Sequence, residues 1–309
     1  MNSERKPGTI HLRLPATSAN LGAGFDTAAV ALDFFLEIDA QPAPEFAIEA
    51  TGRNAESCAR IENNLILETY QQILKDNQRA IQRLALRVQN GIPLGMGCGS
   101  SAAARLAAIA LANTFGNLGW DSDRVLDEAY RLEGHPDNVA ACWLGGFVSA
   151  VCDGSHVSVA RVEPPAEWRA IVAMPQKPLA TSEARAVLPA CYTLGDVVAN
   201  LQSVGTLGLA FAQSRGDLLR LAMQDRIHQP YRESICPLLP ILLPLAGKDG
   251  ILGVALSGAG PAVLIIFEAK QTFSFISSRL LRAVENRVEL DLAESRLSAD
   301  GATQTIEYK

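Results

Sequence analysis

Clusters of cysteine and histidine are missing from this sequence of 309 residues. Its six cysteines form no Cys-x-x-Cys pair, and its four histidines are isolated from one another. Zinc sites and the disulfide frameworks of small secreted domains need such clusters, so the sequence predicts neither. A cytoplasmic protein with reduced thiols is the simplest interpretation.

Runs of positive charge and long apolar segments are also absent. The 27 Lys and Arg residues are scattered and the formal net charge is −6, so no basic surface for nucleic acid is predicted. The longest apolar stretch, residues 251 to 267, is interrupted by Gly258, Gly260 and Pro261, which favours two buried strands over a membrane span. The first eight residues, MNSERKPG, carry charges without an apolar core, so we expect neither a signal peptide nor a membrane anchor.

What the sequence does have is apolar content, 48% of its residues, arranged with the periods of strands and helices. Alternation predicts strands over 10–14 and 84–88, and Asn63 and Asn64 are positioned to cap a helix that runs to residue 74. Further strands are expected at 34–40, 46–50, 169–173, on both sides of 256–262 and twice near the C-terminus, with a hairpin over 146–162. Further helices are expected over 101–113, 122–132, 182–188, 196–213, 216–224, 234–246 and 271–286. The proline-bearing segment 163–167 predicts a boundary between domains at 1–165 and 166–309, each α/β or α+β.

A glycine-rich loop stands between a predicted strand and a predicted helix, in the segment NGIPLGMGCGSSAAARLAAIALAN (90–113). Gly95, Gly97 and Gly99 allow the backbone to approach a ligand closely, and the helix that opens at Ser100 and Ser101 offers unpaired amides to an anion. No lysine completes a Walker loop, and Ser100 occupies the place of the last glycine in the dinucleotide fingerprint. The loop therefore predicts phosphate binding of another kind, with a flexible turn before a buried helix as the alternative.

Four segments together resemble the motifs of the GHMP small-molecule kinases, and most of all those of the homoserine kinase branch. They are PATSANLGAGFDTAAVAL (15–32), PLGMGCGSSAAA (93–104), EGHPDNVAA (133–141) and LSGAGPAVL (256–264), in order and at fitting distances over nearly the whole chain. The departures are Ala23, where proline is usual, and Cys98, where leucine is usual. The resemblance implies an α+β fold of two domains, an N-terminal domain like ribosomal protein S5 and a C-terminal ferredoxin-like α/β sandwich, with ATP and substrate meeting between them.

For the nucleotide, the resemblance implies that loop and helix amides hold the phosphates of ATP and that Mg²⁺ supplies the positive charge. Glu133 is the expected Mg²⁺ carboxylate, with the Ser101 hydroxyl near the metal; Glu128 remains the competing carboxylate. Asn63 and Asn64 resemble the segment on the adenine side. The other implied ATP-binding residues are Pro93, Leu94, Gly95, Met96, Gly97, Cys98, Gly99, Ser100, Ser101, Ala102 and Ala103.

For the acceptor, the resemblance implies phosphorylation of the side-chain hydroxyl of L-homoserine, giving O-phospho-L-homoserine and ADP in threonine biosynthesis. Asn20 and Asp26 are assigned to its amino and hydroxyl groups, and Arg185 and Arg232 to its carboxylate. Arg232 is also expected near the transferring phosphoryl group. Lesser pocket members are Thr181, His135 and Asp137.

The expected mechanism is direct in-line transfer without a phosphoenzyme. Many relatives carry an aspartate base where this chain has Asn138, so Asn138 is expected to orient the nucleophile and no strong base is assigned. The segment 256–262 is expected to close around the site from the second domain. Phosphoryl transfer depends mostly on positioning and charge stabilisation, which is compatible with such a site.

Read singly, these residues have plainer interpretations. Asp26 suits a turn, Arg185 and Arg232 suit surface ion pairs, and Glu133 suits a solvated helix end. Two other functions stay open: a GHMP kinase for another small alcohol such as mevalonate or a sugar, and a non-catalytic relative that binds a small molecule. The resemblance also implies a homodimer without indicating its interface. Cys98, beside a helix N-terminus, is expected to have a lowered pKa and to react with alkylating agents.

Overall fold

The computed structural model describes residues 7–285 and 287–308 and contains two β-sheets. The seven-stranded sheet has the order β11-β1-β2-β4-β3, with the β5–β6 hairpin attached to β2. Its strands are β1 (Pro7–Asn20), β2 (Gly24–Pro42), β3 (Ala47–Gly52), β4 (Leu84–Asn90), β5 (Phe147–Asp153), β6 (His156–Val162) and β11 (Thr303–Tyr308). The four-stranded sheet has the order β10-β7-β9-β8, from β7 (Trp168–Pro175), β8 (Ile251–Leu256), β9 (Val263–Glu268) and β10 (Leu290–Arg296).

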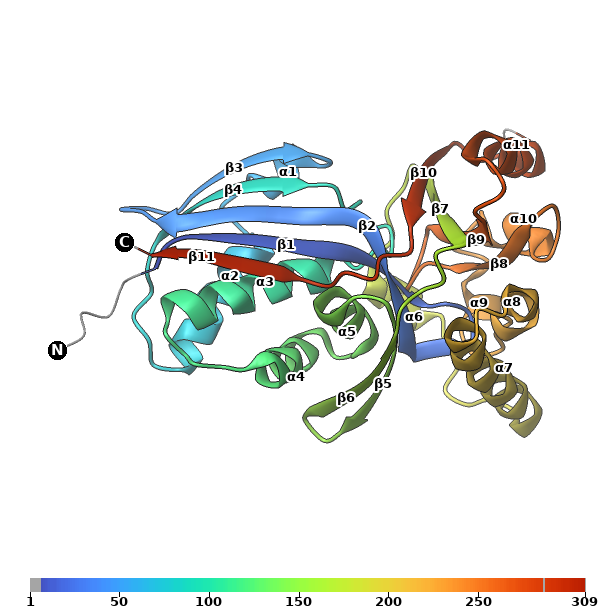
Figure 1. Ribbon diagram of the computed structural model, residues 1–309, viewed down its shortest axis with the longest axis horizontal. Coiled ribbons are helices and arrows are strands. Elements are labelled where there is room, and N and C mark those ends of the chain that lie inside the picture. The colour runs from blue at the N-terminus through green and yellow to red at the C-terminus, as the bar shows by residue number, and fades with distance from the viewer. Residues whose placement is uncertain (1–6, 286, 309) are drawn as a thin grey trace.

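Helices cover one face of the first sheet (Figure 1). The alternation of β1 decides which face: Ile10, Leu12 and Leu14 are buried, whereas His11 and Arg13 point outward and pair with Asp39 and Glu37 across the strands. The covering helices are α2 (Leu65–Asp76), α3 (Ser100–Phe115), α4 (Ser122–Glu133) and α5 (Asp137–Leu144); a short α1 (Ala55–Cys58) follows β3. The first sheet is therefore half-buried, as the alternating sequence predicted.

The second sheet carries helices on both faces. Alternate residues of β7 separate: Ala170 and Val172 join the core beside α7 and α8, while Ile171 and Ala173 join the core beside α10 and α11. This double burial explains why the strands read as continuous apolar runs. The helices of this half are α6 (Thr181–Ala186), α7 (Leu194–Ala212), α8 (Gly216–Ala222), α9 (Gln229–Arg232), α10 (Leu239–Leu242), the 3-10 turn η1 (Leu243–Leu245) and α11 (Phe273–Val284).

Most predicted elements are present, but three features differ. The single helix expected over 234–246 is wrong, because prolines at 237, 240 and 244 lack the amide that a continuous helix needs and the segment forms only α10 and η1. Helices α1, α5 and α9 and the part of β2 before residue 34 were not predicted. Strand β11 pairs antiparallel with β1, so the chain returns to the first sheet; the division at 165/166 otherwise stays a prediction.

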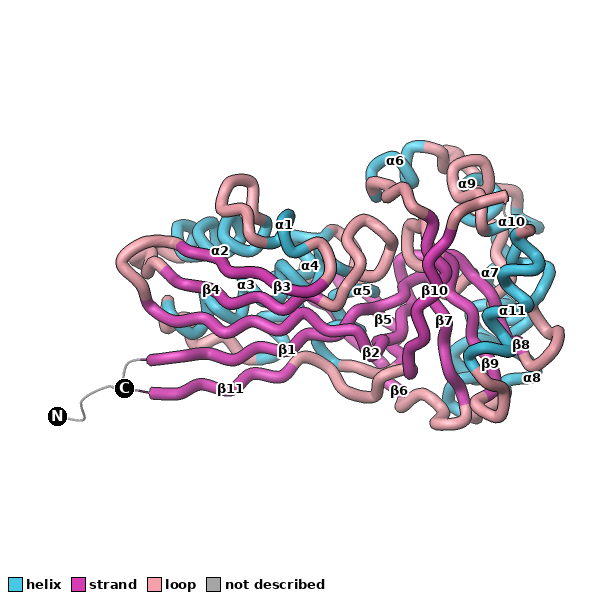
Figure 2. Tube along the Cα trace, turned by 90° about the horizontal axis from the view of Figure 1, so that it is seen from above, coloured by secondary structure: helices cyan, strands magenta, loops and turns pink. Residues whose placement is uncertain are grey.

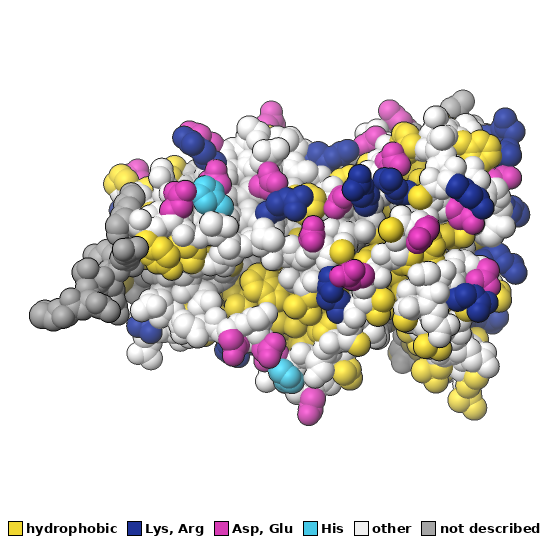
Figure 3. Space-filling model, in the orientation of Figure 1, with side chains coloured by type: hydrophobic (Ala, Val, Ile, Leu, Met, Phe, Trp, Pro, Cys, Tyr) yellow, Lys and Arg dark blue, Asp and Glu magenta, His cyan; other side chains and the backbone are white. Residues whose placement is uncertain are grey.

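Charged side chains of both signs are mixed on the face of the molecule that Figure 3 shows, with no large area of one sign. Among the helices described, none combines the length and apolar character needed to cross a membrane. The N-terminal expectation about MNSERKPG falls largely on residues 1–6, which lie outside the described residues.

The two halves meet where β1 and β2 turn back at residues 20–24 (Figure 2). Asn20 donates to the Gly258 carbonyl (2.8 Å), and the Gly258 amide donates to the Ala19 carbonyl (3.0 Å). Phe147 of β5 stacks on Phe211 of α7 at 4.2 Å between ring centroids. One apolar core thus extends across both sheets and leaves a cleft at the junction.

Candidate active site

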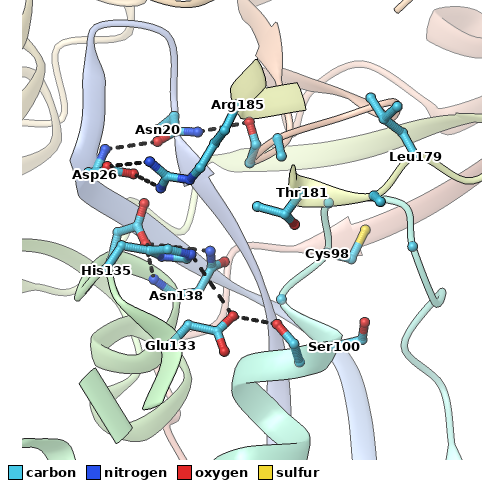
Figure 4. A pocket seen from close by; sticks show the side chains of 18 of the residues that line it. Asn20, Asp26, Cys98, Ser100, Glu133, His135, Asn138, Leu179, Thr181 and Arg185 are labelled. Carbon is cyan, nitrogen blue, oxygen red and sulfur yellow. Dashed lines mark hydrogen bonds and ion pairs between the residues drawn. The ribbon is translucent and has the colours of Figure 1, made fainter. Parts of the chain in front are cut away.

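The cleft gathers side chains from six separate segments of the chain (Figure 4). It is lined by Asn20, Phe25, Asp26, Gly95, Gly97, Cys98, Gly99, Ser100, Ser101, Glu133, His135, Asp137, Asn138, Leu179, Ala180, Thr181, Arg185, Arg232, Gly258 and Ala259. All the residues that the sequence assigned to the substrate and to Mg²⁺ are in this set. Motifs from both halves therefore face one cavity.

The glycine loop is held against the second half of the molecule. Gly97 has φ +74°, and a side chain there would collide with the Ser257 carbonyl; Ser257 Oγ lies 2.9 Å from Gly97 O. Gly99, with φ +70°, is the N-cap of α3 and packs on Thr17, where a methyl group would also collide. The first free amides of α3 follow directly and face the cavity from Ser100 and Ser101.

A second, apolar cavity adjoins the first and shares Ser100 and Ser101 with it. Its walls include Asn63, Asn64 and Leu94 of the predicted nucleotide set, and also Leu36, Ser57, Cys58, Leu65, Ile66, Val88, Asn90, Ile92 and Ala104. Asn64 caps α2 by accepting from the amides of Ile66 and Leu67 (3.1 and 3.3 Å), as expected of its position. Asn63 is exposed, with φ +55°.

Four predicted nucleotide residues line neither of these cavities: Pro93, Met96, Ala102 and Ala103. Ala102 and Ala103 are fully buried within α3. The Ala103 amide already donates to the Gly99 carbonyl (3.0 Å), so it has no hydrogen left for a phosphate. The part of Ala103 in nucleotide binding stays a prediction, and its backbone amide is not available for it.

Cys98 differs from the expectation. The thiol is 1% exposed, and burial raises its pKa to about 12. Its hydrogen bond with Ser257 and the charge of Arg53 oppose that rise without overcoming it. The predicted lowered pKa is wrong, because the buried thiol is desolvated and desolvation disfavours the charged thiolate.

Two carboxylates competed for the metal role, and their contacts differ. Glu128 is bound by Arg131 (2.6 and 3.1 Å) and Arg124 (3.3 Å) and is not among the residues lining the cleft. Glu133, the last residue of α4, contacts the Ser101 hydroxyl, and its side chain is 8% exposed. Its Oε2 forms an ion pair with Arg105 Nε at 3.0 Å, without an aligned hydrogen bond.

Helix α5 opens with Asp137 and Asn138 facing the cleft. Asp137 is 1% exposed and lies 2.7 Å from His135 Nδ1. Burial by itself would lower the pKa of His135, but the hydrogen bond with Asp137 and the charges of Glu133 and Asp26 raise it. Asn138 Oδ1 accepts from Thr17 (2.6 Å), a contact that the sequence motif did not reveal.

Two arginines enter the cleft in different settings. Arg185 binds Asp26 through both carboxylate oxygens (2.6 and 3.0 Å), and this contact raises the pKa of Arg185. Arg232 is 1% exposed, and burial, together with the charge of Arg185, lowers its pKa. It donates to Ala184 O (2.9 Å) and His228 Nδ1 (3.0 Å) and reaches Gly258 O at 3.4 Å.

His228 is a site residue that sequence reasoning missed. It is fully buried, and its Nε2 lies 2.8 Å from the Gly22 carbonyl, which only accepts. Nε2 therefore carries the proton and Nδ1 is the acceptor for Arg232, so the imidazole is neutral. Phe25, also missed, stacks on this ring at 5.2 Å and lies beneath both arginines.

Comparison with known proteins shows the family of this chain. Residues 64–146 match the model of the GHMP kinases N terminal domain, and residues 209–286 match that of the GHMP kinases C terminal domain. A homoserine kinase of Solibacter usitatus is 42% identical over 84% of this chain and 85% of its own length, and one of Carboxydothermus hydrogenoformans is 37% identical over 96% and 97%. The crystal structure of homoserine kinase from Cytophaga hutchinsonii superposes with a TM-score of 0.80 at 25% identity, covering 99% of each chain. With the glycine loop, the α4–α5 segment and the 256–264 turn meeting in one cleft, the chain belongs to the homoserine kinase family of the GHMP kinases.

Proposed function

We propose that the protein transfers the γ-phosphoryl group of ATP to the side-chain hydroxyl of L-homoserine, giving O-phospho-L-homoserine and ADP in threonine biosynthesis. The observation that carries this proposal is the composition of one cleft. The glycine loop and the Ser101–Glu133 pair line the same cleft as Asp26 and Arg185. These two side chains carry the charges that the ammonium and carboxylate groups of an amino acid need as partners.

The nucleotide would span both cavities. Ser100 and Ser101 lie where the cavities join, so the phosphates would sit on the loop and on the first amides of α3, with the helix dipole favouring their charge. The adenine would then lie between Asn63, Asn64 and the apolar residues of the second cavity. Such a largely apolar wall suits a planar base.

The residues present fit a magnesium ion. Mg²⁺ prefers oxygen ligands, and Glu133 offers a carboxylate oxygen without a hydrogen bond, beside the Ser101 hydroxyl. We choose Glu133 over Glu128 because Glu133 lines the cleft beside Ser101, whereas Glu128 does not line it and is bound by two arginines. Bound Mg²⁺ would supply the positive charge that the loop, which has no lysine, does not.

The acceptor would be oriented by groups at both of its ends. Asn20 and Asp26 would bind the ammonium and hydroxyl groups, and Arg185 and Arg232 the carboxylate, for which a planar guanidinium is well suited. Asn138, fixed by Thr17, would orient the hydroxyl toward the phosphoryl group, and Arg232 would stabilise the developing charge. Thr181, His135 and Asp137 complete the pocket wall.

A coupled assay of ADP formation tests the proposal. The unaltered protein with Mg²⁺ and ATP is given L-homoserine, L-threonine, L-serine, mevalonate or galactose, and selective turnover of L-homoserine is expected. Arg185→Ala should mainly raise KM, and Glu133→Gln should mainly lower kcat. Glu128→Gln should change neither constant. Cooperative unfolding of each variant shows that it is still folded. Turnover of another alcohol would keep the kinase and reject the acceptor; ATP binding without any turnover would indicate a binding protein.

Two further parts of the proposal concern the setting of the enzyme. We place it in the cytoplasm, which the free cysteines support. We also propose a homodimer, which sedimentation velocity would distinguish from a monomer.

A further inference from the structure

Two side chains that the proposed function assigns to oppositely charged groups of the substrate bind each other. Arg185 Nη2 lies 2.6 Å from Asp26 Oδ1, and Nη1 lies 3.0 Å from Oδ2, in a two-pronged ion pair (Figure 4). Asp26 belongs to β2 of the first half, and Arg185 belongs to α6 of the second. The pair therefore bridges the cleft at the place where an amino acid would be held.

The pair is accessible enough for a ligand to replace it. The Asp26 and Arg185 side chains are 33% and 38% exposed, so solvent screens them and the net stability of the contact is small. A buried pair of the same geometry would resist separation far more strongly. Because the pair is partly exposed, an exchange of partners costs little free energy, provided that each separated charge finds a new partner.

The other ionisable groups near the pair already have close partners. His135 and Asp137, whose ligand atoms and those of Asp26 lie within 4.8 Å of one another, bind each other at 2.7 Å. Arg232 donates to two carbonyls and to neutral His228, and among the described residues it makes no ion pair with a carboxylate. If Asp26 and Arg185 are separated, the charges that remain near them are the more distant ones of His135 and Asp137, so the ligand itself must supply a close partner for each.

We propose that the Arg185–Asp26 pair is a charge filter that selects acceptors carrying both an ammonium and a carboxylate group. An acceptor with both groups replaces both partners, with its ammonium on Asp26 and its carboxylate on Arg185. An alcohol with one charged group separates the pair but leaves one member uncompensated, and a neutral alcohol cannot separate it. This inference rests on the orientation of the substrate in the proposed function.

Binding of three ligands to three forms of the protein tests the filter. The ligands are L-homoserine, its deaminated analogue 4-hydroxybutyrate and its decarboxylated analogue 3-aminopropan-1-ol, titrated by calorimetry with a non-hydrolysable ATP analogue present. In Asp26→Asn the guanidinium of Arg185 is released, so 4-hydroxybutyrate should bind about fivefold more tightly while L-homoserine binds about tenfold more weakly. In Arg185→Gln the effect should be mirrored: 3-aminopropan-1-ol should gain affinity and L-homoserine should lose it.

A matched control comes from an ion pair outside the cleft. Asp217 also binds Arg215 through two hydrogen bonds (2.7 and 2.8 Å), and both side chains are more than half exposed. Asp217→Asn should leave all three affinities unchanged. Thermal unfolding of each variant shows whether it is folded, and the two cleft variants test the filter independently of each other.

Opposite shifts for the zwitterion and the singly charged analogue support the filter. If Asp26→Asn weakens 4-hydroxybutyrate as well, or leaves it unchanged, the pair does not oppose singly charged ligands and the inference is wrong. Failure of the proposed function would look different: the unaltered protein would then not phosphorylate L-homoserine, whatever the analogues do in the variants.

Discussion

Cys98 shows how a residue's environment can reverse an expectation drawn from its position in the sequence. Its neighbours in the chain suggested a reactive thiol at a helix N-terminus, whereas burial raises its pKa to about 12. We predict that iodoacetamide at pH 8 modifies exposed Cys191 in the native protein and leaves Cys98 unmodified, because only a thiolate reacts quickly. Peptide mass spectrometry measures both sites, and labelling of the unfolded protein provides the control. Equal labelling rates in the native state would contradict this account of Cys98.

His228 gives the fold a specific response to acid. Burial and the charge of Arg232 lower its pKa below 6.5, although Asp225 and the Gly22 carbonyl oppose the shift. Below pH 6.5 His228 is protonated in the unfolded chain but stays neutral in the folded protein. Its contribution to the free energy of unfolding is therefore fully present above pH 6.5 and is lost as the pH falls toward the pKa of the folded state. At pH 5.5 this one group accounts for at most about 1.4 kcal/mol.

We therefore predict that His228→Leu reduces the acid dependence of stability. Urea unfolding at pH 7.5 and pH 5.5 gives the difference in free energy for each protein, and the difference should be smaller in the variant. His228→Leu should also be less stable at pH 7.5, because Arg232 loses an acceptor. An unchanged difference between the two pH values would show that His228 is not the group responsible.

At the scale of single elements, the glycine loop depends on the turn between β8 and β9. Gly97→Ala would place a methyl group against the backbone carbonyl of Ser257, in a backbone conformation that alanine disfavours. We predict that Gly97→Ala destabilises the protein by more than about 2 kcal/mol and weakens ATP binding. Gly119→Ala is the matched control, since Gly119 has φ +70° and a methyl group there would meet no described atom within 4 Å beyond its chain neighbours. It should cost only about 1 kcal/mol with ATP affinity intact. Equal losses in the two variants would mean that the contact with Ser257 is unimportant.

The elements that could be predicted from sequence are those with a strong local signal. Ile10, Leu12 and Leu14 fix a strand by alternation, Asn64 caps α2, and Gly134 ends α4. Helix α5 was missed because it has only eight residues and follows a His-Pro sequence that suggests a loop. The helix expected over 234–246 failed because apolar periodicity alone does not register the missing proline amides.

Prediction of the site was limited by the distance between its parts along the chain. The motifs nominated Asp26, Glu133 and Arg185, and the fold brings them into one cleft. They gave no signal for His228 or Phe25, whose roles arise only from packing against Arg232. The pairing of Asp26 with Arg185 joins residues 159 positions apart, which no local pattern reveals.

For the whole molecule, the question is whether its two halves unfold together. The chain crosses between them after β6 and again before β11, which returns to pair with β1. Polar contacts close the junction: Ser257 Oγ lies 2.9 Å from Ser18 Oγ, and Asn20 donates to Gly258 O (2.8 Å). The apolar core is continuous as well, because Phe147 of β5 stacks on Phe211 of α7. Because the two halves share one apolar core and β11 returns to the first sheet, neither half should be stable alone.

We predict a single calorimetric transition for the protein, raised as a whole by MgATP. A ligand at one hundred times its Kd stabilises the folded state by about 2.7 kcal/mol, and a cooperative molecule distributes that gain over both halves. Phe211→Ala removes an aromatic stack at the junction while leaving the cleft lining intact, so it should lower the transition temperature and begin to separate two transitions. Two transitions in the unaltered protein, with only one raised by MgATP, would instead show that the halves are independent domains. The boundary expected at residues 163–167 would then mark units that unfold separately, and β11 would unfold with the first.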